Sequence, residues 1–177
     1  VVVVSIGLGG ALLVDVAGFL AVALVLMVVR PAYEPAREVG NTRTELVAGL
    51  RAVREVPGVV GLLTGVALLA GGLLPMLTHG VPLLVRSRGW DAGVAGVVEG
   101  CWVAAGLAVS LVVARVGTRD RVLAPLVGGP LLSAVGAIGL VAAPEPYVAS
   151  AAAGLMGVGT VLFTSHVFPL LVLKAPE

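Results

Sequence analysis

The sequence predicts an all-α membrane protein: a polytopic bundle of about five transmembrane helices with one short cytoplasmic amphipathic helix. Of the 177 residues, 59% are hydrophobic and only 12% are charged, whereas an average soluble domain carries roughly 25% charged residues. The mean hydropathy is +1.12. Several apolar runs also exceed about 18 residues, the length typical of a transmembrane helix. These observations exclude a soluble domain, a disordered chain and a secreted module held by disulfides.

The apolar segments are each long enough to cross a bilayer core of about 30 Å as a helix. They run from about Val1 to Val29, Pro57 to Val85, Gly93 to Ala114, Val122 to Ala142 and Tyr147 to Phe168. Helices are expected because hydrocarbon offers the backbone no hydrogen-bond partners, and the alternation typical of barrel strands is absent. Glycines and two prolines, Pro75 and Pro82, predict a bend or break in the second segment.

The longest connection divides the chain into an N-terminal segment (1–29), a cytoplasmic linker (30–56) and a C-terminal part with four spans (57–177). Within the linker, Thr42 and Glu45 fit a capping box, and apolar residues then recur at helical spacing. We interpret this stretch as an amphipathic helix on the membrane surface, and a solvated linker helix is the alternative.

Basic residues gather on alternate connections. One side of the predicted membrane carries nine of them and the other carries two, Arg86 and Arg88. The positive-inside rule places the nine-base side in the cytoplasm, so residues 30–56 and 115–121 are expected there. The protein is therefore predicted to be a multi-pass protein of the cell (plasma) membrane.

Small residues recur every fourth position in three spans, and such stripes predict close packing between helices, because lipid supplies no hydrophobic drive for association. The stripes are Ala92, Gly96, Gly100, Ala104 and Ala108; Gly129, Ser133 and Ala137; and Ala149, Ala153 and Gly157.

Two carboxylates fall inside predicted spans. Asp15 lies near the middle of the first span, where a charged side chain costs roughly 2.5–3.5 kcal/mol on insertion scales. A proton-coupling or cation-binding role and a structural hydrogen bond to a neighbouring helix both remain open for it. Glu99 is shallower, about two turns from the outer end of the third span. It is either a cavity-lining acid that binds cationic cargo or a proton or, as its depth favours, an acid reaching the interface.

His79 is the third candidate for a transport pathway, because it lies in the proline- and glycine-rich part of the second span and broken helices often line cavities in transporters. Its place near the outer end also suits an ordinary interfacial histidine. His166 and Lys174 end the fifth span, where a boundary role suffices.

Other chemistries find no support in the sequence. A phosphate-binding loop and an H-E-x-x-H motif are absent, and Cys101 is the single cysteine, so an intrachain disulfide and a cysteine-based metal site are excluded. A nucleophile–base pair and a metal cluster are not visible either, so an enzyme is not expected. We also expect no cofactor, metal site or nucleic-acid partner.

Several local patterns resemble known transporter sequences, and their order strengthens the resemblance. They are Asp15-Val16-Ala17-Gly18-Phe19 followed by Arg30, the stretch Glu45–Arg51 closed by Pro57, and Lys174-Ala175-Pro176-Glu177. Residues Ser110–Arg119 also resemble the cytoplasmic signature G-x-x-x-D-[RK]-x-G-[RK]-[RK]: Arg115, Gly117 and Arg119 match, whereas Ser110, Ala114 and Thr118 do not.

The chain thus resembles the sixth to tenth of the twelve helices of a major facilitator superfamily transporter, of the bacterial drug- or siderophore-exporter kind. The resemblance implies secondary transport of small molecules by alternating access. The expected partners are the lipid bilayer, a small-molecule cargo, protons and the missing half of the transporter. Ala114 stands where the signature has an acid, so an ion pair there is not expected. The chain alone is not expected to transport. The alternative is a non-transporting integral membrane scaffold or assembly subunit.

Overall fold

The computed structural model describes residues 13, 16–25, 27, 51, 56, 58–117 and 122–174, and every regular element within them is helical. The all-α prediction is therefore confirmed. The chain divides into two units, Val1–Arg51 and Ala52–Glu177. In the first unit the structure describes an apolar helix, Val16–Val25. The predicted amphipathic linker helix lies outside the described residues apart from Arg51, which is helical.

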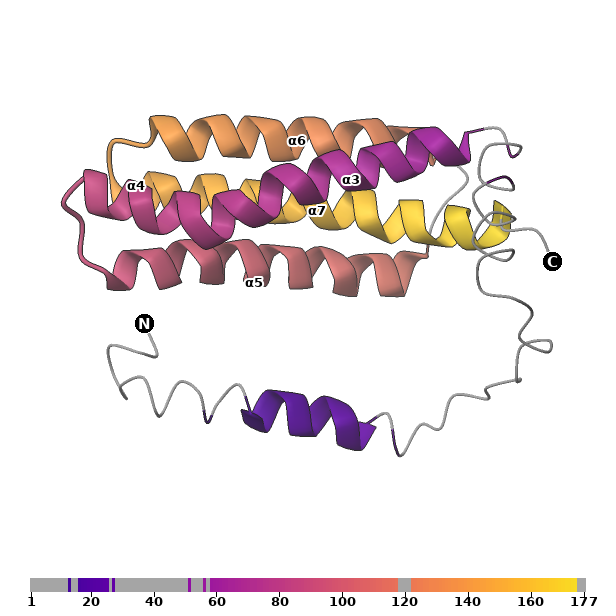
Figure 1. Cartoon of the computed structure of the whole chain (residues 1–177), viewed down its shortest axis with the longest axis horizontal. Helices are drawn as coiled ribbons and strands as arrows, with labels where there is room; N and C mark the ends of the chain where they lie inside the picture. Colours follow the sequence, from indigo (N-terminus) through magenta and orange to yellow (C-terminus); the bar gives the residue numbers. More distant parts are fainter. Residues whose placement is uncertain are drawn as a thin grey trace. The chain divides into compact units, whose positions relative to one another are not determined.

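The second unit contains four apolar helices long enough to cross a membrane, which confirms a membrane protein (Figure 1). Their bounds agree with the predicted second to fifth spans to within a few residues, except that the last helix extends further. The elements are α3 (Val59–Pro75), η1 (Met76–Gly80), α4 (Val81–Ser87), α5 (Gly93–Val116), α6 (Leu123–Ala142) and α7 (Pro146–Lys174).

The first long helix of this unit does not break at its prolines but changes its hydrogen bonding. Between α3 and α4 it becomes a π-helix, η1, in which the Val81 N–H donates to the carbonyl of Met76, five residues earlier. Pro82 has no N–H for the carbonyl of Thr78, and a proline ring crowds the carbonyl four residues before it. The wider π turn relieves this crowding, and such turns are frequent at functional sites.

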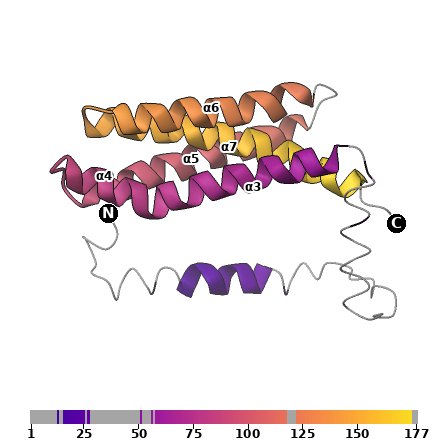
Figure 2. The same ribbon diagram turned by 45° about the horizontal axis from the view of Figure 1, so that its top comes forward.

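Helix α7 is the centre of the bundle. It packs against both α5 and α6, and it also contacts α3 (Figures 1 and 2). Successive helices run in opposite directions, so α3 and α6 begin at the end where α5 and α7 finish (Figure 1). The main apolar core lies toward the opposite end, where Val81 and Val85 of α4 pack with Leu140 of α6 and Met156 of α7.

Glycines set the distance between these helices. A Cβ on Gly129 of α6 would lie 2.7 Å from the carbonyl oxygen of Gly159, and one on Gly157 of α7 would collide with the carbonyl of Trp102 on α5. Backbones this close make van der Waals contacts that larger side chains would prevent. The α6 and α7 stripes are confirmed: Gly129 and Ser133 are buried, as are Ala149, Ala153 and Gly157.

The stripe predicted for α5 is wrong. Four of its five members, Ala92, Gly100, Ala104 and Ala108, are exposed in the structure. Helix α5 instead packs through the face that carries Val98 and Gly106, both buried, and Gly106 lies against Val161 of α7. Both faces offer small residues. The buried face of α5 also carries Trp102 and Val98, which pack against the apolar core.

Candidate functional site

Two of the predicted site residues, Asp15 and Arg119, lie outside the described residues. Glu99 is half-buried in the second turn of α5 and has no hydrogen-bond or ion-pair partner among the described residues. His79 lies in η1 with its side chain exposed. Neither residue makes a hydrogen bond to the other, so the structure does not join these candidates into one site.

The signature-like residues of α5 are placed at its C-terminal end. Arg115 is exposed in the last turn, and Gly117 follows with φ 74°, its N–H donating to the carbonyl of Val113 at 2.8 Å. A residue with positive φ at the end of a helix is typically glycine, because no Cβ then opposes the conformation. Termination of α5 therefore accounts for Gly117 independently of any gating role.

A cavity of about 280 Å³ lies halfway along the bundle, where η1 begins. Leu69 and Gly72 of α3 and Met76 of η1 form one wall. The facing wall comes from α6 and α7, with the residues Pro130, Ser133, Ala134, Ala137 and Met156. Helices that cross a bilayer have their middle at the midplane, so this cavity would lie near the centre of the membrane.

One polar cluster borders this midplane cavity. Ser133 is 5% exposed, and its hydroxyl lies 3.3 Å from both the carbonyl oxygen of Met156 and the hydroxyl of Thr160. Thr160 in turn donates to the Met156 carbonyl at 2.8 Å. The two contacts of Ser133 join α6 to α7, whereas the Thr160–Met156 bond lies within α7. Interhelical bonds of this kind contribute about 0.6 kcal/mol each on average in a membrane protein. The cavity therefore has an apolar surface with one hydroxyl at its edge.

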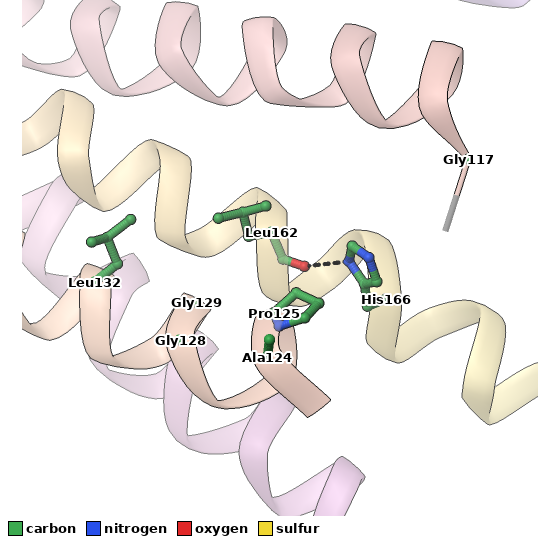
Figure 3. Close-up of a pocket in the computed structure, with 8 residues that line it drawn as sticks. All are labelled: Gly117, Ala124, Pro125, Gly128, Gly129, Leu132, Leu162 and His166. Atoms are coloured by element: carbon green, nitrogen blue, oxygen red, sulfur yellow. Dashed lines mark hydrogen bonds between the residues drawn. The ribbon is translucent and has the colours of Figure 1, made fainter. Parts of the chain in front are cut away.

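A second cavity, of about 510 Å³, lies at the end of the bundle where α5 finishes and α6 begins (Figure 3). Its lining residues are Gly117, Ala124, Pro125, Gly128, Gly129, Leu132, Leu162 and His166. His166 is only 9% exposed, and its Nδ1 lies 2.8 Å from the carbonyl oxygen of Leu162, one turn earlier in α7. The imidazole is thus buried within the bundle. We expected His166 to lie at the end of the span, but α7 continues beyond it to Lys174.

Only one of the residues that line these cavities was identified from the sequence as a candidate site residue. Of the predicted site residues that the structure describes, only Gly117 lines either cavity. A signal existed for His166, because a histidine within an apolar span and one turn before Pro169 is unusual in a membrane helix. For Met76 and Ser133 the sequence held no such signal, since both residue types are common in transmembrane helices.

The arrangement can hold small apolar molecules at two depths, with a serine hydroxyl at one and an imidazole at the other. In the part of the chain that the structure describes, no three His, Cys, Asp or Glu side chains gather into a group that could hold a metal ion. A scan against models of protein families, a search of curated proteins and a search of solved structures found no match to this chain.

Proposed function

We propose that the chain is part of a secondary active transporter of the major facilitator type, which exports small amphipathic molecules by alternating access and is driven by protons. It would work in the plasma membrane, with residues 30–56 and 115–121 in the cytoplasm and with cargo bound between this part and the remaining helices. One observation carries the proposal: a cavity halfway along the bundle lies beside a helix whose α-helical hydrogen bonding is interrupted. Transporters typically build their binding sites from such interrupted helices at the midplane.

The lining of the midplane cavity indicates the kind of cargo. Its walls are aliphatic and thioether side chains, with the Ser133 hydroxyl as the one side-chain polar group among the lining residues. Burial of an apolar cargo there would contribute about 25 cal/mol for each Å² removed from water. In this proposal Glu99 contacts the cationic part of a cargo and Asp15 carries the coupling proton.

A pair of neighbouring substitutions tests the role of the cavity. Both Ala134 and Val135, its neighbour in α6, are exposed, but only Ala134 lines the cavity. Phenylalanine at 134 would fill the cavity, and phenylalanine at 135 would add bulk outside it. In inverted membrane vesicles carrying the complete transporter and energised by a pH gradient, Ala134→Phe should lower the initial rate of ethidium uptake by at least about tenfold, which corresponds to about 1.4 kcal/mol.

The matched control, Val135→Phe, should leave the rate of uptake within about twofold of wild type at an equal amount of protein in the membrane, which is less than about 0.5 kcal/mol. Equal rates for the two variants would remove the cavity from the transport path. Absence of gradient-driven uptake by the wild type, tested over cationic, neutral and anionic dyes, would contradict transport itself and favour the scaffold or assembly subunit.

A further inference from the structure

The cavity at the end of α7 differs from the midplane cavity in its polar group and its depth, and it is not required for the transport proposal. Its one titratable lining residue is His166, which is about nine-tenths buried. From this group and the shape of the lining, we propose that the cavity binds a small neutral aromatic molecule with one hydroxyl group, a phenol, whose O–H donates to Nε2 of His166.

The tautomer of His166 follows from its hydrogen bond. Nδ1 lies 2.8 Å from the carbonyl oxygen of Leu162, and a carbonyl can only accept, so Nδ1 carries the hydrogen. In the neutral imidazole the other ring nitrogen, Nε2, is then an acceptor. Figure 3 shows that nitrogen turned away from Leu162, and it has no partner among the described residues. The His166 ring, which lines the cavity, therefore carries one fixed acceptor that no described residue uses.

The rest of the lining favours a planar apolar ring. The cavity volume of about 510 Å³ falls within the range of roughly 300–1,000 Å³ that is typical of small-molecule sites. Gly128 leaves open space beside α6, because a Cβ there would meet no atom within 4 Å, whereas Gly129 next to it packs against α7. Pro125, Leu132 and Leu162 add aliphatic surface, and none of the lining side chains carries a fixed charge.

This combination selects among ligand classes. A purely apolar molecule would leave Nε2 buried without a partner, which costs free energy. An ionised carboxylate offers no hydrogen to an acceptor, and it would lose its hydration against the apolar wall. A neutral phenol supplies both the donor that Nε2 lacks and a flat ring for the open space beside Gly128.

The test compares 4-propylphenol with 4-propylanisole, its methyl ether, which has nearly the same shape but no O–H. The full chain is reconstituted in lipid nanodiscs, and binding is measured after subtraction of the partition into empty nanodiscs. The phenol should bind at least about tenfold more tightly than the ether. It should also shift the ¹⁵N resonance of His166 Nε2, assigned with His166→Gln, whereas the ether should leave that resonance in place.

Two variants test separately the hydrogen-bond acceptor of His166 and the space in the cavity. His166→Phe keeps an aromatic ring but removes the acceptor, so the preference for the phenol should disappear. Gly128→Leu should abolish binding of both compounds, because leucine would occupy open space without displacing neighbours. Equal binding of the two compounds by the wild type, or a preference that survives in His166→Phe, would overturn the proposal. If a variant does not fold, the ¹⁵N spectrum of the wild type still tests the proposal. A phenol that binds but leaves the His166 Nε2 resonance unmoved would contradict the proposal.

Discussion

Several hydroxyl groups and one imidazole inside these helices make hydrogen bonds within their own helix. Thr64, Thr78, Ser150 and Thr164 each donate to the carbonyl four residues earlier, at 2.8 to 3.0 Å. His166 does the same with its Nδ1. A backbone carbonyl with a spare lone pair is the nearest acceptor in hydrocarbon, and this bond avoids the cost of an unsatisfied donor.

An ionised carboxylate has no such solution, because it can only accept and the carbonyls one turn away also only accept. Asp15, if it lies in a span as the sequence predicts, therefore needs a proton or a donor from elsewhere. This gives it two states with different partners, which is the property that proton coupling requires. Glu99 likewise has no hydrogen-bond or ion-pair partner among the described residues.

Asp15→Asn should abolish uptake driven by a pH gradient in inverted vesicles while leaving membrane insertion normal, because the amide keeps the shape and loses the proton exchange. The measurement is the initial rate at an equal amount of protein in the membrane. Asp91→Asn is the matched control: Asp91 lies in the turn before α5, where its Oδ1 accepts the N–H of Gly93 at 2.8 Å, and an amide oxygen accepts equally well. Unchanged gradient-driven uptake in Asp15→Asn would remove Asp15 from the mechanism.

At the scale of elements, the four spanning helices are held together by backbone approach at particular glycines. Spacing alone identified the packing faces of α6 and α7, but it selected the wrong face of α5. Small residues on a helix face permit close contact with another helix. The contact forms only where the surface of a neighbouring helix has a complementary shape. On α5 that match lies at Gly106, against Val161 and the Gly157 carbonyl of α7.

Two adjacent glycines of α6 allow a direct measurement of this packing. A Cβ on Gly129 would lie 2.7 Å from the Gly159 carbonyl oxygen and 2.9 Å from Phe163, so Gly129→Ala should lower the free energy of unfolding by about 1–3 kcal/mol. Gly128→Ala meets open space and should be neutral or add up to about 1 kcal/mol through helix propensity. Reversible unfolding in mixed detergent micelles measures both. Equal stability of the two variants would contradict the packing described.

At the scale of the whole molecule, charge and helix direction agree. In the structure α3 begins, α5 ends, α6 begins and α7 ends on the same side of the bundle (Figure 1), as alternate connections require. In the sequence the connections of this side carry nine of the eleven basic residues. That asymmetry predicts which side faces the cytoplasm.

The orientation can be measured with single cysteines in a Cys101→Ser background. In intact cells a membrane-impermeant maleimide should label Arg86→Cys, and it should label Arg43→Cys and Arg119→Cys only after the membrane is permeabilised. The reason is that nine bases on one side favour retention of that side in the cytoplasm. Labelling of positions 43 and 119 from opposite compartments would contradict the topology, including the predicted linker.

The amino-acid sequence by itself determined that the described part of the chain is helical and which connections share a side. It also placed the ends of the four described spans to within a few residues, except the end of α7, which extends to Lys174. These properties follow from a local rule, because every backbone group in hydrocarbon must be satisfied within its own segment. The sequence also located a disturbance near Pro75 and Pro82, since a proline lacks the N–H that an α-helix needs. It predicted a bend or break there, whereas the structure has a π turn in a continuous helix.

Only the tertiary structure decided that α7 is central, that α5 turns Gly106 rather than Ala104 toward it, and that Ser133 and His166 border cavities. Each of these depends on shape complementarity between helices far apart in the sequence. In a chain with 25 glycines and small residues on several faces, many pairings satisfy the local rule equally well. Selection among them rests on the few large side chains, such as Met156 and Phe163, that fill the spaces between particular helices.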